Sequence, residues 1–141
     1  MFKKLLKNER GLTLVELLAV IVILGVISAV AVPSIGNIIQ KSKEDAVKAD
    51  AIAMINAAKL YIMEQDVSSN TDIKRSELIS NDYLEATGTE WDNDPTVTYN
   101  SNNELVLSGS AKAGKVTLTF DDATIEDINE HESGKNKNTI K

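Results

Sequence analysis

The sequence has no cysteine and little that would serve catalysis. Without cysteine, disulfides, thiol nucleophiles and zinc sites with thiolate ligands are excluded. The one histidine, His131, lies in a polar stretch, where we expect a solvated surface residue. Asp92 and Asp94 stand two positions apart, but their loop lacks the glycine and the glutamate of an EF-hand calcium loop. We therefore predict no enzyme active site, no cofactor and no metal site.

Charge is distributed unevenly along the chain of 141 residues, whose formal net charge is −6. Residues 1–11 hold four basic side chains against Glu9, a balance of +3, so the remainder carries −9. These basic residues are Lys3, Lys4, Lys7 and Arg10. An acidic bulk argues against nonspecific binding to phosphates, so we predict no direct binding of nucleic acid.

A long apolar run follows the basic segment. From Leu12 to Val32 there are 21 residues with a single charge, that of Glu16. This length is close to the ~20 apolar residues that a helix needs to cross a bilayer. The basic segment is expected to stay on the cytoplasmic side, which places the later residues outside. We therefore predict a membrane-spanning helix over residues 12–35.

The helical pattern continues beyond this span, because apolar residues recur at spacings near three and four on two adjoining stripes. The first stripe contains Ile35, Ile38, Ile39, Ala46, Ala49, Ala53, Ala57 and Leu60. The second contains Val47, Ala51, Met54, Ala58 and Tyr61. Together with the span, they predict one helix from about Leu12 to about Gln65 with a wide apolar face in its second half. A domain of this size does not need so long a helix for itself, so we expect it to pack against other chains.

The rest of the chain predicts a small head of helix and sheet. Residues 66–75 are polar and predict a loop, and residues 75–86 predict a short helix with Ser76 as its cap. The segment GTEWDNDP is rich in turn residues. The segments TVTYN, ELVLSG and KVTLTFD predict a three-stranded antiparallel sheet.

The last residues carry weaker signals. The segment DATIEDINEHE predicts a helical turn or an edge element, and the polar tail SGKNKNTIK is expected to fray. The predicted fold class is therefore α+β, with a long N-terminal helix packed on a small antiparallel sheet. The predicted parts are a leader (1–11), a membrane or filament-core helix (12–35) and a head (36–141).

Glu16 is the unexpected residue of the apolar run. A charge near the centre of a bilayer costs roughly 2.5–3.5 kcal/mol, and less near its edge. The span itself offers no cation. If the chain is cut between Gly11 and Leu12, however, Leu12 gains an α-amine that is positive at neutral pH. That amine would face Glu16 across one helical turn, or neutralise Glu16 of a neighbouring chain between packed helices.

The stretch RGLTLVELLAVIVILGVISAVAVP resembles the N-terminus of type IV pilins and their pseudopilin relatives. In that family a short basic leader ends in glycine, and the mature chain has threonine second, glutamate fifth and a long apolar helix. Gly11, Leu12, Thr13 and Glu16 fit this pattern position by position, although phenylalanine is the more usual first residue. The close match covers about residues 7–36.

The resemblance implies a processing step and a set of partners. A membrane prepilin peptidase would cut after Gly11 and methylate the amine of Leu12, which keeps its positive charge. Glu16 would then pair with Leu12 in a helical homopolymer. Further partners would be an assembly platform protein and its ATPase, minor pilins and, before assembly, membrane lipid. The precursor would be a single-pass protein of the cytoplasmic membrane, and the assembled pilus would lie at the cell surface.

Gly25 and Pro33 match a helix-breaking pair that is common in these anchors. Pro33 removes one helical N–H and clashes with the carbonyl of Ala29, and Gly25 is a poor helix former. The helix is therefore able to kink or partly unwind between them when subunits pack. Glycine and proline are also common in membrane helices without such a role.

Four functions fit these observations. The first is a structural subunit, major or shaft, of a type IV pilus or related filament, and the second is a pseudopilin of a competence or type II secretion system. The third is a secreted protein with an ordinary signal peptide cut after Ala31, which Glu16 inside the apolar run argues against. The fourth is a membrane anchor with a small binding head. A mature chain that starts at Leu12 would indicate either of the first two functions, a start at Val32 would indicate the third, and the uncut start would indicate the fourth.

Overall fold

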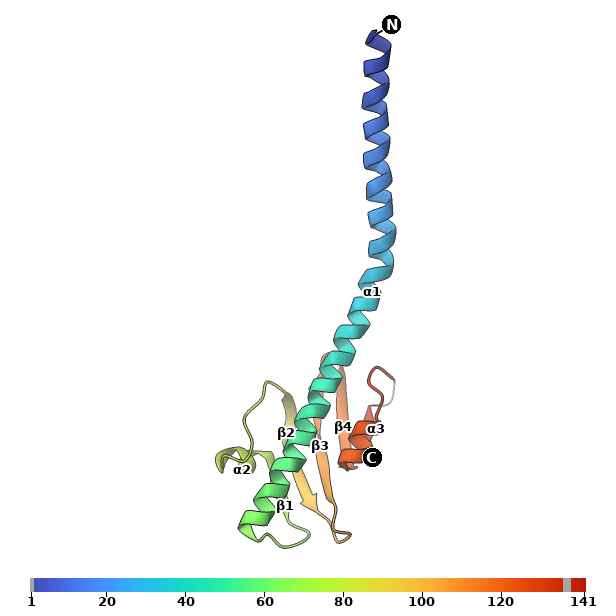
Figure 1. Ribbon diagram of the computed structural model, residues 1–141. Coiled ribbons are helices and arrows are strands. Elements are labelled where there is room, and N and C mark those ends of the chain that lie inside the picture. The colour runs from blue at the N-terminus through green and yellow to red at the C-terminus, as the bar shows by residue number, and fades with distance from the viewer. Residues whose placement is uncertain (1, 136–137) are drawn as a thin grey trace. The chain divides into compact units, whose positions relative to one another are not determined.

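The computed structural model describes residues 2–135 and 138–141, with side chains from Gly11 onward. Over these residues the elements follow the order α1-β1-α2-β2-β3-β4-α3-β5 (Figure 1). The chain divides into two compact units, of which the first ends at Ile38 and the second runs from Ile39 to Lys141. The predicted α+β class, with a long N-terminal apolar helix and a C-terminal sheet that is mostly antiparallel, is confirmed.

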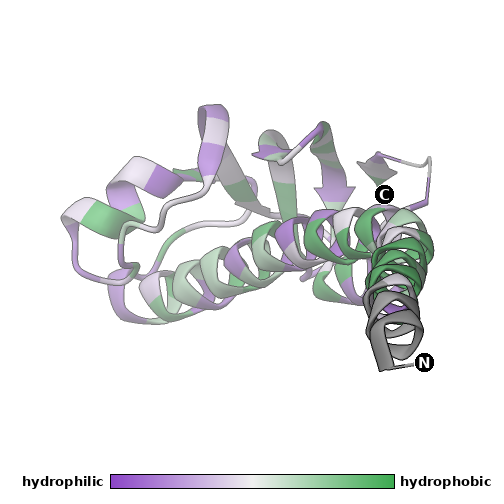
Figure 2. Ribbon diagram, turned by 90° about the horizontal axis from the view of Figure 1, so that it is seen from above, coloured by the Kyte–Doolittle hydropathy of each residue, from purple (hydrophilic) through white to green (hydrophobic). Residues whose placement is uncertain are grey.

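Helix α1 runs from Phe2 to Gln65 and includes Pro33 in its interior. It begins earlier than predicted, because the leader consists largely of lysine, leucine and other good helix formers. It ends where Asp66 takes a left-handed conformation, with φ of 52°, a common way to terminate a helix. Figure 2 shows that hydrophobic residues dominate the part of α1 that follows its grey N-terminal turns, whereas the second half of the helix mixes hydrophobic and hydrophilic residues.

The sheet contains five strands in the order β1-β2-β3-β4-β5. They are β1 (Asp72–Lys74), β2 (Glu90–Tyr99), β3 (Leu105–Ala113), β4 (Val116–Ala123) and β5 (Thr139–Ile140). Neighbouring strands are antiparallel except for β5, which pairs with β4 in parallel. Two short helices, α2 (Arg75–Ser80) and α3 (Ile125–Glu130), flank the central strands in the sequence.

The core of the head lies between the second half of α1 and one face of the sheet (Figure 1). From α1 it buries Val47, Ala51, Met54, Ile55, Ala57 and Ala58. From the sheet it buries Ile73, Val97, Leu107, Ala111, Ala113, Leu118, Phe120, Ala123 and Ile140. Alternate positions of β2, β3 and β4 carry serine and threonine, so that the opposite face of the sheet is polar.

The buried apolar face of α1 is narrower than the two stripes that the sequence predicts. Val47, Ala51, Met54 and Ala58 of the second stripe are buried, as the spacing predicts. Of the first stripe, Ala57 is buried, but the other residues from Ile35 to Leu60 are exposed. The sheet covers only one side of the helix in this two-layer head, so the adjoining stripe stays uncovered.

The turn-rich segment GTEWDNDP does not form only turns, because β2 begins at Glu90 and continues through it. The register moves from Asp92 opposite Ser110 to Thr96 opposite Ser108, so three residues of β2 face Gly109. This bulge places Pro95 against Gly109, where an added Cβ would lie 2.6 Å from the Pro95 Cβ. The asparagine, aspartate and proline that signal a turn are therefore the residues of a β-bulge.

Three other expectations for the head need correction. The segment expected to be a loop contains β1, an edge strand that places Ile73 in the core. Ser76 is not the cap of α2: the N-cap is Lys74, which makes no capping hydrogen bond with its side chain. The tail is not entirely frayed, because β5 pairs with β4 and Ile140 is buried, while residues 136–137 of the tail lie outside the described residues. DATIEDINEHE contains α3, as one of its two interpretations expected.

Candidate functional site

The residues of the predicted processing site all lie on α1. Leu12 and Glu16 are four positions apart in this helix, so their side chains project from the same face. Both residues are exposed, and Leu12 retains 66% of its accessible surface. Among the described residues, Glu16 forms no ion pair within the subunit. The described part of the subunit therefore supplies no counter-charge to this carboxylate.

The surface around Glu16 is almost entirely apolar. Every residue from 11 to 30 is exposed, and so are residues 32–39. The most apolar window of 18 residues in the described helix has a mean hydropathy of 2.8, and none of it is buried in the subunit. The helix is long and apolar enough to cross a membrane. A contiguous apolar surface of this extent marks contact with lipid or with other proteins.

The glycines of this segment have open space beside them inside the subunit. An added Cβ at Gly11 or at Gly25 would find no atom within 4 Å. Packing within the subunit therefore does not require glycine at either position. Helix α1 continues through Gly25 and Pro33 without interruption. The kink or unwinding that this pair predicts on subunit packing stays a prediction.

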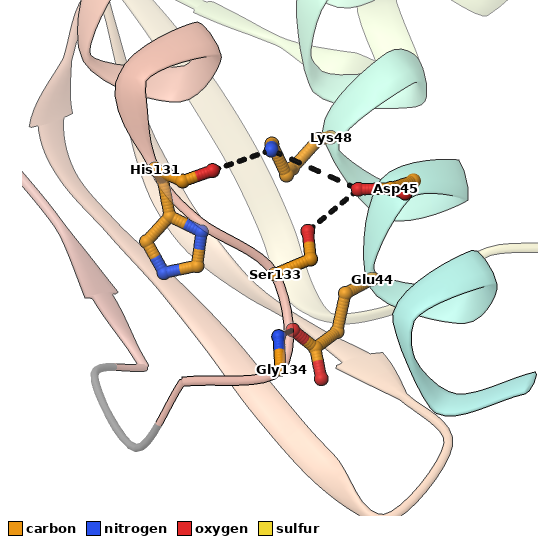
Figure 3. A network of polar contacts seen from close by, with 6 residues as sticks. All are labelled: Glu44, Asp45, Lys48, His131, Ser133 and Gly134. Carbon is orange, nitrogen blue, oxygen red and sulfur yellow. Dashed lines mark hydrogen bonds and ion pairs between the residues drawn. The ribbon is translucent and has the colours of Figure 1, made fainter. Parts of the chain in front are cut away.

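A second polar feature joins α1 to the C-terminal segment (Figure 3). Glu44 is buried, with 3% of its surface exposed. Its carboxylate accepts hydrogen bonds from the backbone N–H of Gly134 at 2.6 Å and from the Gln40 amide at 2.9 Å. Lys48 donates to the carbonyl of His131 at 2.7 Å. The C-terminal segment is thereby held along the start of the helix in the second unit.

Gln40 and Asp50 fix two further segments to α1. The Gln40 amide donates to the carbonyl of Ala113 at 2.7 Å and accepts from the N–H of Lys115 at 3.1 Å, which holds the β3–β4 turn. Asp50 has 7% of its surface exposed. Its carboxylate accepts from the Trp91 indole at 3.0 Å and from the Thr87 hydroxyl at 2.8 Å. Both buried acids of α1 are therefore satisfied by neutral donors.

Comparison with known proteins identifies the N-terminal segment. The prokaryotic N-terminal methylation motif matches residues 6–32. The chain carries a pilin-type methylation motif. This match spans Gly11, Leu12 and Glu16, and it confirms the resemblance to type IV pilins and pseudopilins.

The curated relatives include proteins named as type II secretion system core proteins and one named as a type IV major pilin. The chain is 38% identical over 72 residues to the type II secretion system core protein G of Vibrio cholerae, covering 49% of this chain and 47% of that protein. It is 31% identical over 75 residues to the core protein G of Klebsiella pneumoniae, covering 53% and 54%. It is 35% identical over 59 residues to the type IV major pilin protein PilA of Myxococcus xanthus, covering 42% and 27%.

The matches are partial. The chain spans about half the length of the two core proteins G and about a quarter of PilA. No solved structure gives a significant match to this chain. The comparisons therefore identify the pilin-like character of the chain and leave the kind of filament to be proposed.

The sequence reasoning found the methylation motif but missed the polar anchors of the head. Glu44 and Asp50 adjoin the stripe of Val47, Ala51 and Met54, at helical spacings of three and four from its members. An acid in phase with an apolar stripe is a signal of burial. That signal could have identified both residues before the fold was known.

Other residues singled out in the sequence have structural roles. The Asp94 carboxylate accepts from the N–H of Ser76 at 3.0 Å and from its hydroxyl, which stabilises the start of α2. Trp91 packs against Phe120, with ring centroids 5.7 Å apart. His131 is half-buried rather than fully solvated. Across the described part of the chain, no three His, Asp or Glu side chains are arranged to hold a metal ion.

Two tyrosines attach α2 and its following loop to the end of α1. Tyr61 and Tyr83 make an edge-to-face contact with ring centroids 5.2 Å apart. Tyr61 donates to Glu77 at 2.6 Å, and Tyr83 donates to Glu64. These hydrogen bonds raise the pKa of both phenols, since each stabilises the protonated form beside a carboxylate.

Proposed function

We propose that the chain is a structural subunit of a type IV pilus or a related filament, cut after Gly11 and methylated on the amine of Leu12. The cut would remove residues 1–11. The mature chain would wait in the cytoplasmic membrane as a single-pass protein with its N-terminus on the cytoplasmic side. It would then enter a helical homopolymer, in which residues 12–35 form the core and residues 36–141 form the outer head. Assembly rather than catalysis is the proposed role.

The observation that carries this proposal is Glu16 on an exposed apolar helix inside a methylation motif. Residues 11–30 of the helix have no covering within the subunit, and the described residues supply no cation to the acid. Cleavage after Gly11 creates a positive amine at Leu12, four residues from Glu16. Packed helices would bury the apolar surface and allow the amine of one subunit to neutralise Glu16 of another.

The proposal predicts partners of three kinds. A prepilin peptidase would make the cut, since Gly11 offers no side chain to obstruct the protease site. An assembly platform protein and its ATPase would extract the subunit from the lipid, because the exposed apolar surface prevents spontaneous release into water. Minor pilins and copies of the same chain would cover the helix after assembly.

A pseudopilin function is the second candidate. It is favoured by the two relatives named type II secretion system core protein G, whereas PilA favours a surface pilus. Both candidates use the same processing and the same helix packing. Long filaments sheared from wild-type cells would favour the pilus, and loss of exported protein in a deletion strain without visible filaments would favour the pseudopilin.

An ordinary signal peptide cut after Ala31 is the competing interpretation. The observation against it is that the methylation motif includes this position, while α1 continues through it as regular helix. A cut there would also discard Glu16, for which an ordinary signal peptide has no use.

Mass spectrometry of the mature chain tests the proposed function. We expect Leu12 as the first residue, carrying one added methyl group. Gly11→Val should leave the full-length precursor in the membrane, because a β-branched side chain obstructs the cleavage site. Gly25→Val is the control, because it makes the same glycine-to-valine change farther along the apolar run. This variant should be cut normally. A mature chain that starts at Val32 would overturn the proposal in favour of secretion.

A further inference from the structure

Exposed lysines gather at one end of the head. Lys41 and Lys43 lie at the start of the α1 segment that belongs to the second unit, and Lys115 lies in the β3–β4 turn. All three are exposed. We call this group the lysine end.

The stems of two of these lysines rest on glycines. An added Cβ at Gly134 would meet Lys41 Cε at 2.8 Å, and an added Cβ at Gly114 would meet Lys43 Cδ at 2.8 Å. The two glycines therefore leave room for the lysine stems, whose charged heads reach solvent. Lys115 is positioned by its backbone N–H, which donates to the Gln40 side chain.

The lysine end keeps an excess of positive charge. Three other lysines near it are paired: Lys48 with Asp45 at 3.8 Å, Lys112 with Glu90 at 3.8 Å, and Lys135 with Glu132. Among the described residues, no ion pair involves Lys41, Lys43 or Lys115. The nearby buried Glu44 carboxylate accepts from the neutral donors of Gln40 and Gly134, which leave its charge in place, so it offsets only part of the charge of the three lysines.

The opposite end of the head is acidic. Glu104 precedes β3 and Glu126 lies in the first turn of α3, and both line one groove beside the end of α1. Both are exposed, and the described residues offer neither of them an ion pair. Glu64, near the end of α1, accepts from the neutral Tyr83 hydroxyl. We call Glu64, Glu104 and Glu126 the acid end. Lys59 also lines the groove, so one cation lies beside these three carboxylates.

One subunit cannot bring its two ends together. They lie at opposite ends of β3, which runs from Leu105 to Ala113. At ~3.3 Å per residue, this strand separates them by roughly 26 Å. Each end therefore has to find its counter-charge outside the subunit.

We propose that the lysine end of one subunit docks against the acid end of a second copy of this chain. Subunits repeated along a filament meet head to tail, and such a heterologous contact joins two different patches of the same molecule. Opposite charge on the two patches fixes this polarity and disfavours contact between like ends. The inference rests on the proposed filament function and adds which surfaces of the head meet. An anionic membrane is the other surface that lysines could bind, but it would leave the acid end without a counterpart.

Charge reversal in the full chain tests the contact. Lys43→Glu with Lys115→Glu should lower the yield of sheared filament about tenfold relative to the processed membrane pool, because each attraction becomes a repulsion. Glu104→Lys with Glu126→Lys should lower it similarly. A chain with all four changes has the original net charge. Its two ends are again of opposite charge, with the signs exchanged, so this variant should recover the filament yield.

A matched control separates the position of the charge from its amount. Lys74→Glu with Lys141→Glu gives the same net charge as the change at the lysine end but alters neither the lysine end nor the acid end, and both residues are exposed. This variant should give normal filament yield. A loss equal to that of the variant with Lys43→Glu and Lys115→Glu would overturn the proposal, because net charge alone would then explain the loss.

A disulfide tests the contact independently of filament yield. The chain has no cysteine, so Lys115→Cys and Glu104→Cys introduce the only thiols. A disulfide needs Cα atoms within about 7 Å, which the span of β3 forbids inside one subunit. Oxidation of membranes should therefore give dimers and longer ladders for the double variant, but at most dimers for either single variant.

The possible failures are distinguishable. If the double cysteine variant forms ladders but wild-type cells yield no filament, the pilus function is refuted and the contact is kept. Normal filaments from the charge-reversed variants, without ladders, would refute the contact and keep the function. If reversal at the lysine end lowers the filament yield, reversal at the acid end does not, and the fourfold variant fails to recover filaments, the lysines bind another anionic surface such as the membrane and the proposal is wrong.

Discussion

The Gly134 N–H and the Glu44 carboxylate, 90 positions apart in the sequence, are joined by a hydrogen bond of 2.6 Å. Glu44 is buried and also accepts from Gln40. One carboxylate therefore ties a segment that precedes the central strands in the chain to a segment that follows them. Removing an acceptor in a buried position leaves its donors unsatisfied, which costs more than the hydrogen bond itself contributes.

We predict that Glu44→Ala lowers the free energy of unfolding of the head by about 1–3 kcal/mol. Urea unfolding of the full chain in detergent micelles, followed by the fluorescence of the single tryptophan Trp91, measures this change. Asp45→Asn is the control, because its carboxylate is exposed and an amide oxygen can still accept from Ser133; its effect should stay below about 0.5 kcal/mol. Equal effects of the two variants would contradict the assigned role of Glu44.

Gly109 and Pro95 offer a test of the bulge in β2. An added Cβ at Gly109 would lie 2.6 Å from Pro95 Cβ and 3.2 Å from its Cα. We predict that Gly109→Ala destabilises the head by about 1–3 kcal/mol, because the bulged strand has to move. Gly88→Ala should change little, since its added Cβ meets no atom within 4 Å. Thermal unfolding of both variants checks the difference, and similar melting temperatures would argue against the bulge.

Thr124 and Asp127 form a capping box at the start of α3. The Thr124 hydroxyl donates to Asp127 at 2.5 Å, and this hydrogen bond, with a further one from the Thr124 N–H, lowers the pKa of the Asp127 carboxyl. The ionised form is thus favoured in the folded state. Its contribution to stability is present above the ordinary pKa of aspartate, near ~3.9, and is lost as the pH falls through the lowered pKa of the folded state.

We predict that Thr124→Ala moves the pKa of Asp127 upward and costs about 1 kcal/mol of stability. NMR titration of the carboxyl groups, assigned at Asp127 in both proteins, measures the first effect. The second appears as a lower urea midpoint near neutral pH. An unchanged titration of Asp127 would show that Thr124 does not set its pKa.

Residues 36–141 should fold without the apolar span. The core of the head is made from residues 47–140, all within the second compact unit. We expect this fragment to be soluble, to give a dispersed amide NMR spectrum and to unfold cooperatively. Aggregation with a collapsed spectrum would show that the head depends on the N-terminal segment.

The main elements could be predicted because their signals are local. Helix α1 follows from the spacing of Val47, Ala51, Met54 and Ala58, and the central strands follow from alternation. The Gly11, Leu12 and Glu16 pattern lies within a few residues and requires no tertiary information. These features are specified by neighbours in the sequence, which sequence reasoning sees.

The missed elements depend on distant contacts. Strand β5 consists of Thr139 and Ile140, which are too few to show a period and are held by β4. The bulge at Pro95 has the composition of a turn and becomes part of a strand only because Gly109 leaves room for it. Burial of Asp50 depends on donors that lie 37 and 41 positions away. Such pairings appear only once the fold is known.

The central claim is that Glu16 is an assembly device that pairs with the Leu12 amine of a neighbouring subunit. A pair of this kind adds little net stability, but removing one partner leaves a charge stranded at a cost of typically ~3–5 kcal/mol. Glu16→Ala should still be inserted and cut, since the span becomes more apolar and the cleavage site is unchanged. It should fail to enter filaments, and Glu16→Gln should be intermediate or equally poor.

The most direct measurement is the ratio of sheared surface filament to processed membrane subunit, for Glu16→Ala expressed alone in a strain that lacks the native chain. Leu17→Ala, which shortens the adjacent exposed side chain without changing charge, is the control. The account predicts a normal processed pool for both variants and filament from Leu17→Ala only. A normal filament yield from Glu16→Ala would contradict it.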